Sequence, residues 1–428
     1  MKHVRDFFLS AVERVFARLP SALLMIVLGA FVGPEVVGAY SWMALALTLS
    51  QALVDVPLRQ ISVEAVSSTG GTRLVHRSQL IGIAVSTSVL VLTYVVVVVA
   101  FTDLTQGDAW LFFPLIAVPI ASIGSVSSIA RLQAGNEWAS LARIRSFSAL
   151  LSLACTLPLL ISTHSMLWVA IQPLIVESFV FALSAYRVRR SIQSNEPEVL
   201  DGDGRMAAEL RSLTGYALLG WAEGQLDRVL LGAIAGTTAL GSYSYSQALG
   251  RSGGEAVANA SANVLRAQVA PLRDQPAKIL KALDRSALVA LSASAVVVVL
   301  VWAASEFVLP GFLSPAWAAA LAAAPVMALS LLPSTTTWLI TVQLVSLRST
   351  RRALPSRLTG LALALPIALL ATQSLQLAAW AVVARATLVL LTLAFTVRTW
   401  MPWFSITLSS ALALLPLATV AILAAVSS

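Results

Sequence analysis

The segment LGAFVGPEVVGAYS at residues 28–41 returns in altered form as LGAIAGTTALGSYS at residues 231–244. At this offset of 203 residues, seven of the fourteen positions are identical, including Gly29/Gly232, Gly33/Gly236, Gly38/Gly241 and Tyr40/Tyr243. Each copy stands near the start of one half of the chain. The sequence therefore predicts an internal repeat, in which the two halves share one architecture.

The composition places this repeat in a membrane. Of the 428 residues, 58% are hydrophobic and only 11% are charged, whereas a soluble domain carries about 25% charged residues. Lipid must therefore be the main solvent, and the backbone polar groups must be satisfied within helices or a closed barrel. The apolar runs are long and continuous rather than alternating, which favours helices.

Thirteen apolar segments are long enough to cross a bilayer, because a hydrocarbon core of roughly 30 Å needs about 20 residues per helix. The predicted spans are 17–34, 38–62, 79–102, 109–131, 143–163, 165–187, 213–236, 240–266, 285–309, 318–347, 355–373, 375–398 and 402–427. Residues 1–18 mix Phe and Leu with Lys and Arg. That pattern predicts an interfacial amphipathic helix on the inner surface of the membrane.

Basic residues fall on alternate connections between these spans. The even-numbered connections carry clusters of Arg and Lys, among them Arg73, Arg77, Arg143, Arg145, Arg187, Arg189, Arg190, Lys278, Lys281 and Arg348. The odd-numbered connections carry neither Lys nor Arg. Because cytoplasmic loops hold the positive charge of a membrane protein, this pattern predicts a cytoplasmic N-terminus.

The same offset of 203 residues carries spans one to six onto spans seven to twelve. Since six is an even number, both copies have the same orientation, as in a parallel repeat about an axis along the membrane normal. We expect an all-α polytopic membrane protein of two six-helix bundles, with lobes over 19–187 and 213–398 joined by a cytoplasmic linker over 188–212. Residues 402–427 would form an additional transmembrane helix. Two such bundles are a transporter layout.

Several kinds of chemistry find no support in this sequence. Cys155 is the only cysteine, so neither a disulfide nor a Cys-based metal site can form within one chain. No lysine follows a Gly-rich phosphate loop, and no Ser/His pair suggests a catalytic triad. The basic clusters resemble topology signals and no nucleic-acid-binding module. We therefore predict a protein that is not an enzyme and has no cofactor, no metal and no nucleic-acid partner.

Charged side chains within the predicted spans are costly, so they usually face a cavity or one another. Here they fall on single helical faces. The polar residues are Asp55 and Arg59 in span two, Glu223, Asp227 and Arg228 in span seven, and Arg251, Glu255 and Asn259 in span eight. We expect these residues to line a hydrated central cavity between spans two, seven and eight.

Two chemical roles follow for that cavity. Arg59, Arg228 and Arg251 would bind a phosphate-bearing substrate, since guanidinium forks fit phosphate oxygens. Glu223 and Asp227, one turn apart, are candidates to bind H⁺ or Na⁺. An alternative remains open, in which Asp55–Arg59 and Arg251–Glu255 are i,i+4 ion pairs that only satisfy each other.

A second pairing is suggested by the repeat. Glu177 in span six and Arg385 in span twelve lie at nearly equivalent repeat positions and have opposite charge. Such a pair could form across the two lobes.

The residues also resemble a known family. The segments DRVLLGAIAGTTALGSYSYSQAL at 227–249 and LGAFVGPEVVGAYSWMALAL at 28–47 resemble the Wzx-like polysaccharide flippases of the MOP (multidrug/oligosaccharidyl-lipid/polysaccharide) exporter superfamily. In that family both half-starts have a Gly-rich helix end, a short outer turn and a Gly-x-Tyr that opens the next helix. The Asp-Arg pair of the seventh helix is also typical of it.

The resemblance implies a MATE-like fold and alternating access. It implies a flippase that moves a polyprenyl-pyrophosphate-linked oligosaccharide to the outer leaflet of a bacterial inner membrane, for cell-surface polysaccharide synthesis. It further implies a cationic lumen, polysaccharide-assembly proteins as partners and function as a monomer. The thirteen spans and the mixed-charge lumen depart from the family pattern, and they leave open whether the substrate is a lipid-linked sugar or something smaller.

Four other functions are alternatives to this one. A MATE-type cation-coupled multidrug antiporter would prefer an acidic, aromatic-lined cavity. A flippase for a lipid-linked peptidoglycan precursor would share the architecture but usually has fourteen helices. A membrane glycan polymerase or ligase would need a larger outer loop than any predicted here. A non-transporting scaffold subunit would leave the intramembrane charges without a purpose.

Overall fold

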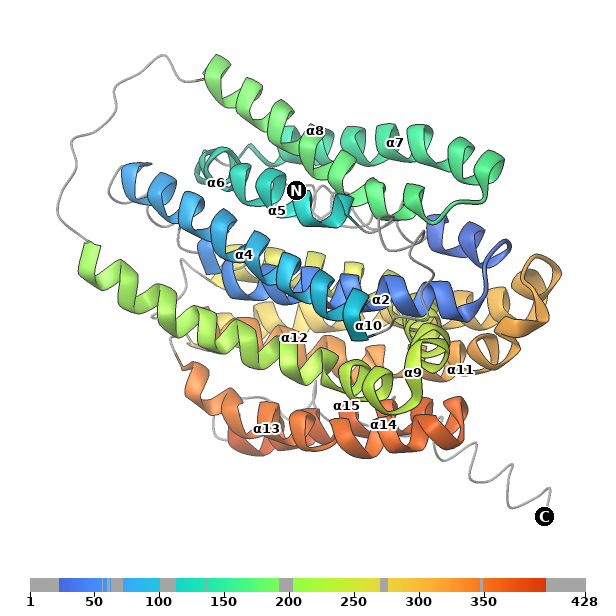
Figure 1. The fold of residues 1–428 in the computed structure, drawn as a ribbon. Coiled ribbons are helices and arrows are strands. Elements are labelled where there is room, and N and C mark those ends of the chain that lie inside the picture. The colour runs from blue at the N-terminus through green and yellow to red at the C-terminus, as the bar shows by residue number, and fades with distance from the viewer. Residues whose placement is uncertain are drawn as a thin grey trace. The chain divides into compact units, whose positions relative to one another are not determined.

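The computed structural model describes residues 23–55, 57–59, 62, 72–100, 113–135, 137–191, 203–269, 276–346 and 349–397. Every regular element within these ranges is helical (Figure 1). The predicted interfacial helix 1–18 and the predicted additional span 402–427 lie outside the described residues. Of the predicted linker 188–212, residues 188–191 belong to one helix and residues 203–212 to the next.

The first half of the chain begins with a helical segment at 23–29. It continues with α2 (Pro34–Ser50), the π-turn η1 (Gln51–Asp55), α4 (Thr72–Ala100), α5 (Pro114–Gly124), α6 (Val126–Ala134), α7 (Trp138–Thr163) and α8 (Leu167–Ser191).

The second half begins with the 67-residue α9 (Asp203–Val269). It continues with α10 (Pro276–Ala303), the short helices η4 (Ala304–Val308), η5 (Leu309–Gly311) and η6 (Pro315–Trp317), α11 (Ala318–Leu329), α12 (Leu331–Ser346), η7 (Thr350–Ala353), α13 (Leu354–Ala362), α14 (Ala364–Gln373) and α15 (Leu375–Val397).

These segments coincide with predicted spans one to twelve. Eight helices of the described chain are long and apolar enough to cross a membrane, and a bent pair, Pro315–Leu329 with Leu331–Leu344, would make a ninth. The two members of that pair meet at 44°. The α9 helix falls outside this count, although its two limbs match spans seven and eight. The protein is therefore a multi-pass, all-helical membrane protein.

The two limbs of α9 meet at Gly236. Its backbone angles, φ 80° and ψ −175°, lie in a region that only glycine adopts without strain. The kink falls at the end of predicted span 213–236. The sequence therefore placed this turn correctly, and Gly236 separates two helices within α9.

Spans four and ten are both broken, at Ser125 and Ser330. The Ser125 hydroxyl donates a hydrogen bond to the carbonyl of Ser122 at 2.7 Å, and that of Ser330 to Met327 at 2.6 Å. A serine hydroxyl that bonds the preceding turn competes with the helical backbone and often bends it. The break therefore has the same local cause in α5–α6 and in α11–α12.

Contacts divide the described chain into two compact units. The N-terminal unit holds 23–28 and 39–225, and the C-terminal unit holds 29–38 and 226–397. In the first, α7 lies beside α8, and their core includes Leu141, Val176 and Val180 (Figure 1). In the second, α11, α12, α13 and α14 all pack on α15, around a core that includes Tyr243 and Met327.

Within the C-terminal unit, the two copies of the repeated segment meet through glycine. A side chain at Gly38 would overlap the carbonyl group of Thr237, and one at Gly241 would overlap the carbonyl group of Pro34. Gly38 and Gly241 are equivalent in the repeat, and so are Pro34 and Thr237. The contact is therefore reciprocal, as a two-fold relation between the copies would produce.

Candidate functional site

Asp227, on the first limb of α9, is a fully buried charge of the C-terminal unit. Its side chain is 0% exposed. The Tyr243 hydroxyl donates a hydrogen bond to Oδ2 at 2.7 Å, and the Arg228 backbone amide donates one to Oδ1 at 3.0 Å. Arg385 of α15 completes the shell with an ion pair, 3.1 Å from Nη2 to Oδ2. Both carboxylate oxygens are thus occupied, which suits a structural anion.

The side chain of Arg228 joins the two limbs of α9. Its Nε donates a hydrogen bond of 2.7 Å to Oε1 of Gln247 on the second limb. The Nε2 atom of the buried Gln247 side chain has no hydrogen-bond partner within the described residues. Arg228 is therefore held at the kinked helix by Gln247, whose buried amide nitrogen has no partner among the described residues.

The second limb of α9 carries the predicted stripe of Arg251, Glu255 and Asn259. Nε of Arg251 lies 3.5 Å from Oε1 of Glu255, and the two side chains are 16% and 26% exposed. At that distance the two side chains form an ion pair but no hydrogen bond through Nε. The buried Nε atom of Arg251 has no hydrogen-bond partner in the part of the chain that the structure describes. Asn259 donates to the Glu255 carbonyl oxygen at 2.9 Å. Nε of Arg251 thus lacks a hydrogen bond, whereas Nε of Arg59 and Nε of Arg228 each donate one.

The N-terminal unit holds the other predicted pair. Arg59 Nε donates to Oδ1 of Asp55 at 2.7 Å, and Nη2 donates to the Ser122 carbonyl of α5 at 3.4 Å. Asp55 ends the π-turn η1, an irregularity that is common at functional sites. Glu223, also in this unit, is half-buried on the first limb of α9, one turn before Asp227.

The predicted pairing of Glu177 with Arg385 is wrong. Glu177 forms an ion pair with Arg145 of α7, 3.3 Å from Oε1 to Nη1, while Arg385 pairs with Asp227. The sequence interpretation counted Arg145 with the cytoplasmic charges at the start of span 143–163, whereas in the structure it lies within α7, which begins at Trp138. Because α7 packs on α8, this cation lies beside Glu177.

Both i,i+4 pairs expected from the sequence are present, Asp55–Arg59 and Arg251–Glu255. The Asp227–Arg385 and Arg145–Glu177 pairs were missed, because each joins two different helices and no local pattern shows which helix faces meet. Among the residues that the structure describes, no group of three His, Cys, Asp or Glu side chains could hold a metal ion. The predicted site residues can therefore offer a ligand guanidinium and amide donors. Three of their carboxylates, those of Asp55, Asp227 and Glu255, are already in ion pairs.

Comparisons with known proteins agree with this architecture. The model of a family described as "Polysaccharide biosynthesis protein" matches residues 27–322. No curated protein sequence matches the chain.

Solved structures match nearly the whole chain. The lipid II flippase MurJ, in an inward closed conformation, is 12% identical, with 97% of this chain and 92% of that chain covered and a TM-score of 0.65. The Vibrio cholerae MATE transporter VcmN in its bent form is 15% identical, with coverages of 94% and 99% and a TM-score of 0.66. A MOP superfamily transporter from Pyrococcus furiosus, described as having a binding pocket of reverse polarity, is 12% identical, with coverages of 95% and 96% and a TM-score of 0.61. At these identities the likeness shows the fold alone, which is MATE-like.

Proposed function

The chain belongs to the polysaccharide biosynthesis protein family, and we propose that it is a flippase for a polyprenyl-pyrophosphate-linked oligosaccharide. It would move this lipid from the cytoplasmic to the outer leaflet by alternating access. The single observation that carries the proposal is Arg251, a cation at membrane depth whose buried Nε has no hydrogen-bond partner among the described residues.

The substrate explains why such a cation is useful. A pyrophosphate group cannot enter an apolar interior without compensation, because an isolated charge at membrane depth costs several kcal/mol. An arginine binds phosphate oxygens through two parallel N–H donors. Arg251, whose Nε lies 3.5 Å from Oε1 of Glu255 and has no hydrogen-bond partner among the described residues, can turn its guanidinium to a phosphate while Glu255 remains nearby.

The neighbouring groups extend the same chemistry. Gln247 Nε2 is buried without a partner in the described chain, and Gln247 already holds Arg228. Arg59 is 25% exposed and held by Asp55 one turn away, so an incoming phosphate can compete with that carboxylate. We propose Arg59, Arg228 and Arg251 as the cations that the pyrophosphate meets in transit.

Coupling to an ion would use a carboxylate that is free to change its state. Asp227 is a poor choice, because Arg385, Tyr243 and the Arg228 amide occupy both its oxygens. Glu223 and Glu255 are more exposed, and we propose them as the sites where H⁺ or Na⁺ would bind if transport is coupled.

The MATE-like fold alone fits an antiporter equally well, so the distinction rests on charge. A cationic drug needs carboxylates that no arginine neutralises. Three of the four predicted carboxylates of the lumen, Asp55, Asp227 and Glu255, lie in an ion pair with an arginine. This favours an anionic substrate over a cationic one.

The setting follows from the family and the charge pattern. We propose a bacterial inner membrane, a cytoplasmic N-terminus and polysaccharide-assembly proteins as partners, with a monomer as the transporting unit.

The test is transport by the purified, full-length chain in proteoliposomes. A fluorescent polyprenyl-pyrophosphate oligosaccharide is placed in one leaflet, and its arrival in the other is followed by reduction with a membrane-impermeant quencher. A parallel set of vesicles is loaded with a fluorescent cationic dye. Flipping of the lipid without dye efflux supports the proposal. Dye efflux under an ion gradient, with no flipping of any lipid-linked sugar tried, would replace it with the antiporter.

A further inference from the structure

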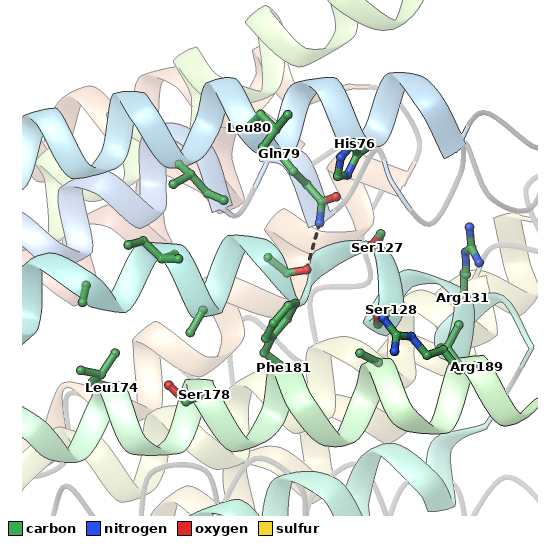
Figure 2. A pocket seen from close by; sticks show the side chains of 17 residues that line it. His76, Gln79, Leu80, Ser127, Ser128, Arg131, Leu174, Ser178, Phe181 and Arg189 are labelled. Atoms are coloured by element: carbon green, nitrogen blue, oxygen red, sulfur yellow. Dashed lines mark hydrogen bonds between the residues drawn. The ribbon is translucent and has the colours of Figure 1, made fainter.

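A cavity of about 700 Å³ lies within the N-terminal unit, away from the polar residues described above. It is enclosed by α4, α5, α6 and α8. Figure 2 shows His76, Ser127, Ser128, Arg131 and Arg189 gathered toward one end of it. Leu174 and Ser178 of α8 lie toward the other end. The cavity therefore has a polar end and a mainly apolar body.

The polar end is cationic. Arg131 is half-buried on α6, and Arg189 is exposed on the last turns of α8. Within the part of the chain that the structure describes, neither forms an ion pair, and His76 has no carboxylate partner either. No described Asp or Glu lines the cavity. Arg131 and Arg189 thereby differ from Arg145 and Arg187 of the same unit, which are paired with Glu177 and Glu137.

The apolar body opens onto the lipid-facing surface. Leu80 is 58% exposed, Ile120 53% and Phe181 43%. In a membrane-spanning unit, exposed apolar side chains of this kind face acyl chains. The cavity is thus a groove that a lipid tail can enter from the side.

The cavity wall is shaped by the helix break between α5 and α6. Gln79 of α4 donates hydrogen bonds to the carbonyl of Ile123 at 2.9 Å and to that of Gly124 at 3.2 Å (Figure 2). A side-chain donor thereby satisfies carbonyls at the break, where unsatisfied backbone groups would be costly in lipid. Phe181 packs against Gly124, where an added Cβ would lie 3.3 Å from its ring.

The end with His76, Arg131 and Arg189 lies among the basic connections that the sequence assigns to the cytoplasm. Anionic phospholipids give the cytoplasmic leaflet its negative surface potential. We infer that this cavity is a binding site for an anionic phospholipid of the cytoplasmic leaflet, its phosphate held by Arg131 and Arg189 and one acyl chain lying along Leu80, Ile120 and Phe181. The inference does not depend on which substrate the protein transports.

Native mass spectrometry of the full-length protein in detergent tests this assignment. Phosphatidylglycerol and phosphatidylcholine of identical acyl chains are added in parallel, and the bound fraction of each is measured. We expect phosphatidylglycerol to bind more tightly. The preference should fall about fivefold for each of Arg131→Gln and Arg189→Gln, the factor expected for one basic side chain near an anionic headgroup. Arg143→Gln, which removes an exposed cation of α7 outside the cavity, should leave it unchanged.

Two further arms separate the possible sources of the phosphate. Glycerol 3-phosphate carries the headgroup charge without a tail, and undecaprenyl phosphate carries a phosphate on a polyprenyl tail. Displacement of phosphatidylglycerol by either one at equimolar concentration would overturn the phospholipid assignment. So would equal binding of the two phospholipids.

A labelling experiment keeps the inference testable if the arginine variants do not fold. Ser128→Cys, in a Cys155→Ser background, places one thiol at the polar end of the cavity. Phosphatidylglycerol should slow its reaction with a maleimide several-fold more than phosphatidylcholine does. An equal rate with both lipids counts against a bound anionic phospholipid.

Discussion

Arg385 of α15 and Asp227 of α9 form a buried ion pair, 3.1 Å from Nη2 to Oδ2, with side chains 6% and 0% exposed. The two residues belong to helices twelve and seven of the predicted order. Their contact fixes the first limb of α9 next to the helix on which α11 to α14 pack. This pair is more deeply buried than Arg59 and Arg251 of the proposed pathway, whose side chains are 25% and 16% exposed.

Removing Arg385 alone should therefore be strongly destabilising. Arg385→Gln leaves the Asp227 carboxylate uncompensated, at a cost of about 3–5 kcal/mol. The double variant Asp227→Asn/Arg385→Gln removes both charges and should recover much of that loss. Chemical unfolding in detergent, run as a double-mutant cycle, measures both. A double variant whose loss equals the sum of the losses of Asp227→Asn and Arg385→Gln would show that the pair has no coupling energy.

The ion pair Asp55–Arg59 should contribute much less to stability than Asp227–Arg385 does. It is an i,i+4 pair with Arg59 one-quarter exposed, and such pairs contribute only about 0.2–0.5 kcal/mol. Asp55→Asn should leave the unfolding midpoint nearly unchanged while altering the rate of lipid flipping. A large loss of stability with normal flipping would assign the pair a structural role.

The reciprocal glycine contact predicts a steric effect. Gly38→Val and Gly241→Val would place side chains onto the carbonyls of Thr237 and Pro34. Each substitution should destabilise the protein by about 1–3 kcal/mol and therefore lower the melting temperature by several degrees. Gly33→Ala is the matched control, because an added Cβ there meets nothing within 4 Å. Differential scanning fluorimetry compares the three. An unchanged melting temperature in both valine variants contradicts the close approach.

The kink of α9 makes a separate prediction. Gly236 has φ 80° and ψ −175°, so Gly236→Ala should cost about 1–3 kcal/mol. Gly224→Ala, in the regular part of the same helix, should be neutral or stabilising because alanine is the better helix former. Chemical unfolding midpoints of the two variants test this prediction. A Gly236→Ala variant as stable as the wild type would rule out the strained kink.

The sequence predicts the spans of this fold well and the helix lengths poorly. Hydropathy reports where a segment meets lipid, whereas a helix can continue into water. The α4 helix begins at Thr72 rather than 79, and α10 at Pro276 rather than 285. The breaks at Ser125 and Ser330 also escape prediction, because a serine bends a helix only where the tertiary packing allows it.

The prediction of ion pairs from the sequence is limited in a similar way. Pairs one helical turn apart, Asp55–Arg59 and Arg251–Glu255, can be predicted because the helix itself brings them together. Asp227–Arg385 cannot, since no local pattern reveals which faces of α9 and α15 meet. The Gly-rich end of the predicted span gives the position of the Gly236 turn. No feature of the repeat predicts that Gly38 approaches Thr237 and that Gly241 approaches Pro34.

The most direct test of the proposed cationic pathway is the flipping rate of the Arg251→Gln protein in proteoliposomes. Arg351→Gln is its control, because Arg351 is an exposed arginine of the same unit on η7. We predict that Arg251→Gln lowers the flipping rate of the polyprenyl-pyrophosphate oligosaccharide about tenfold or more, the factor for losing a charge-assisted hydrogen bond of about 1.5–3 kcal/mol. Arg351→Gln should flip at the wild-type rate. Equal rates for all three well-folded proteins would contradict a role for Arg251 in carrying the pyrophosphate.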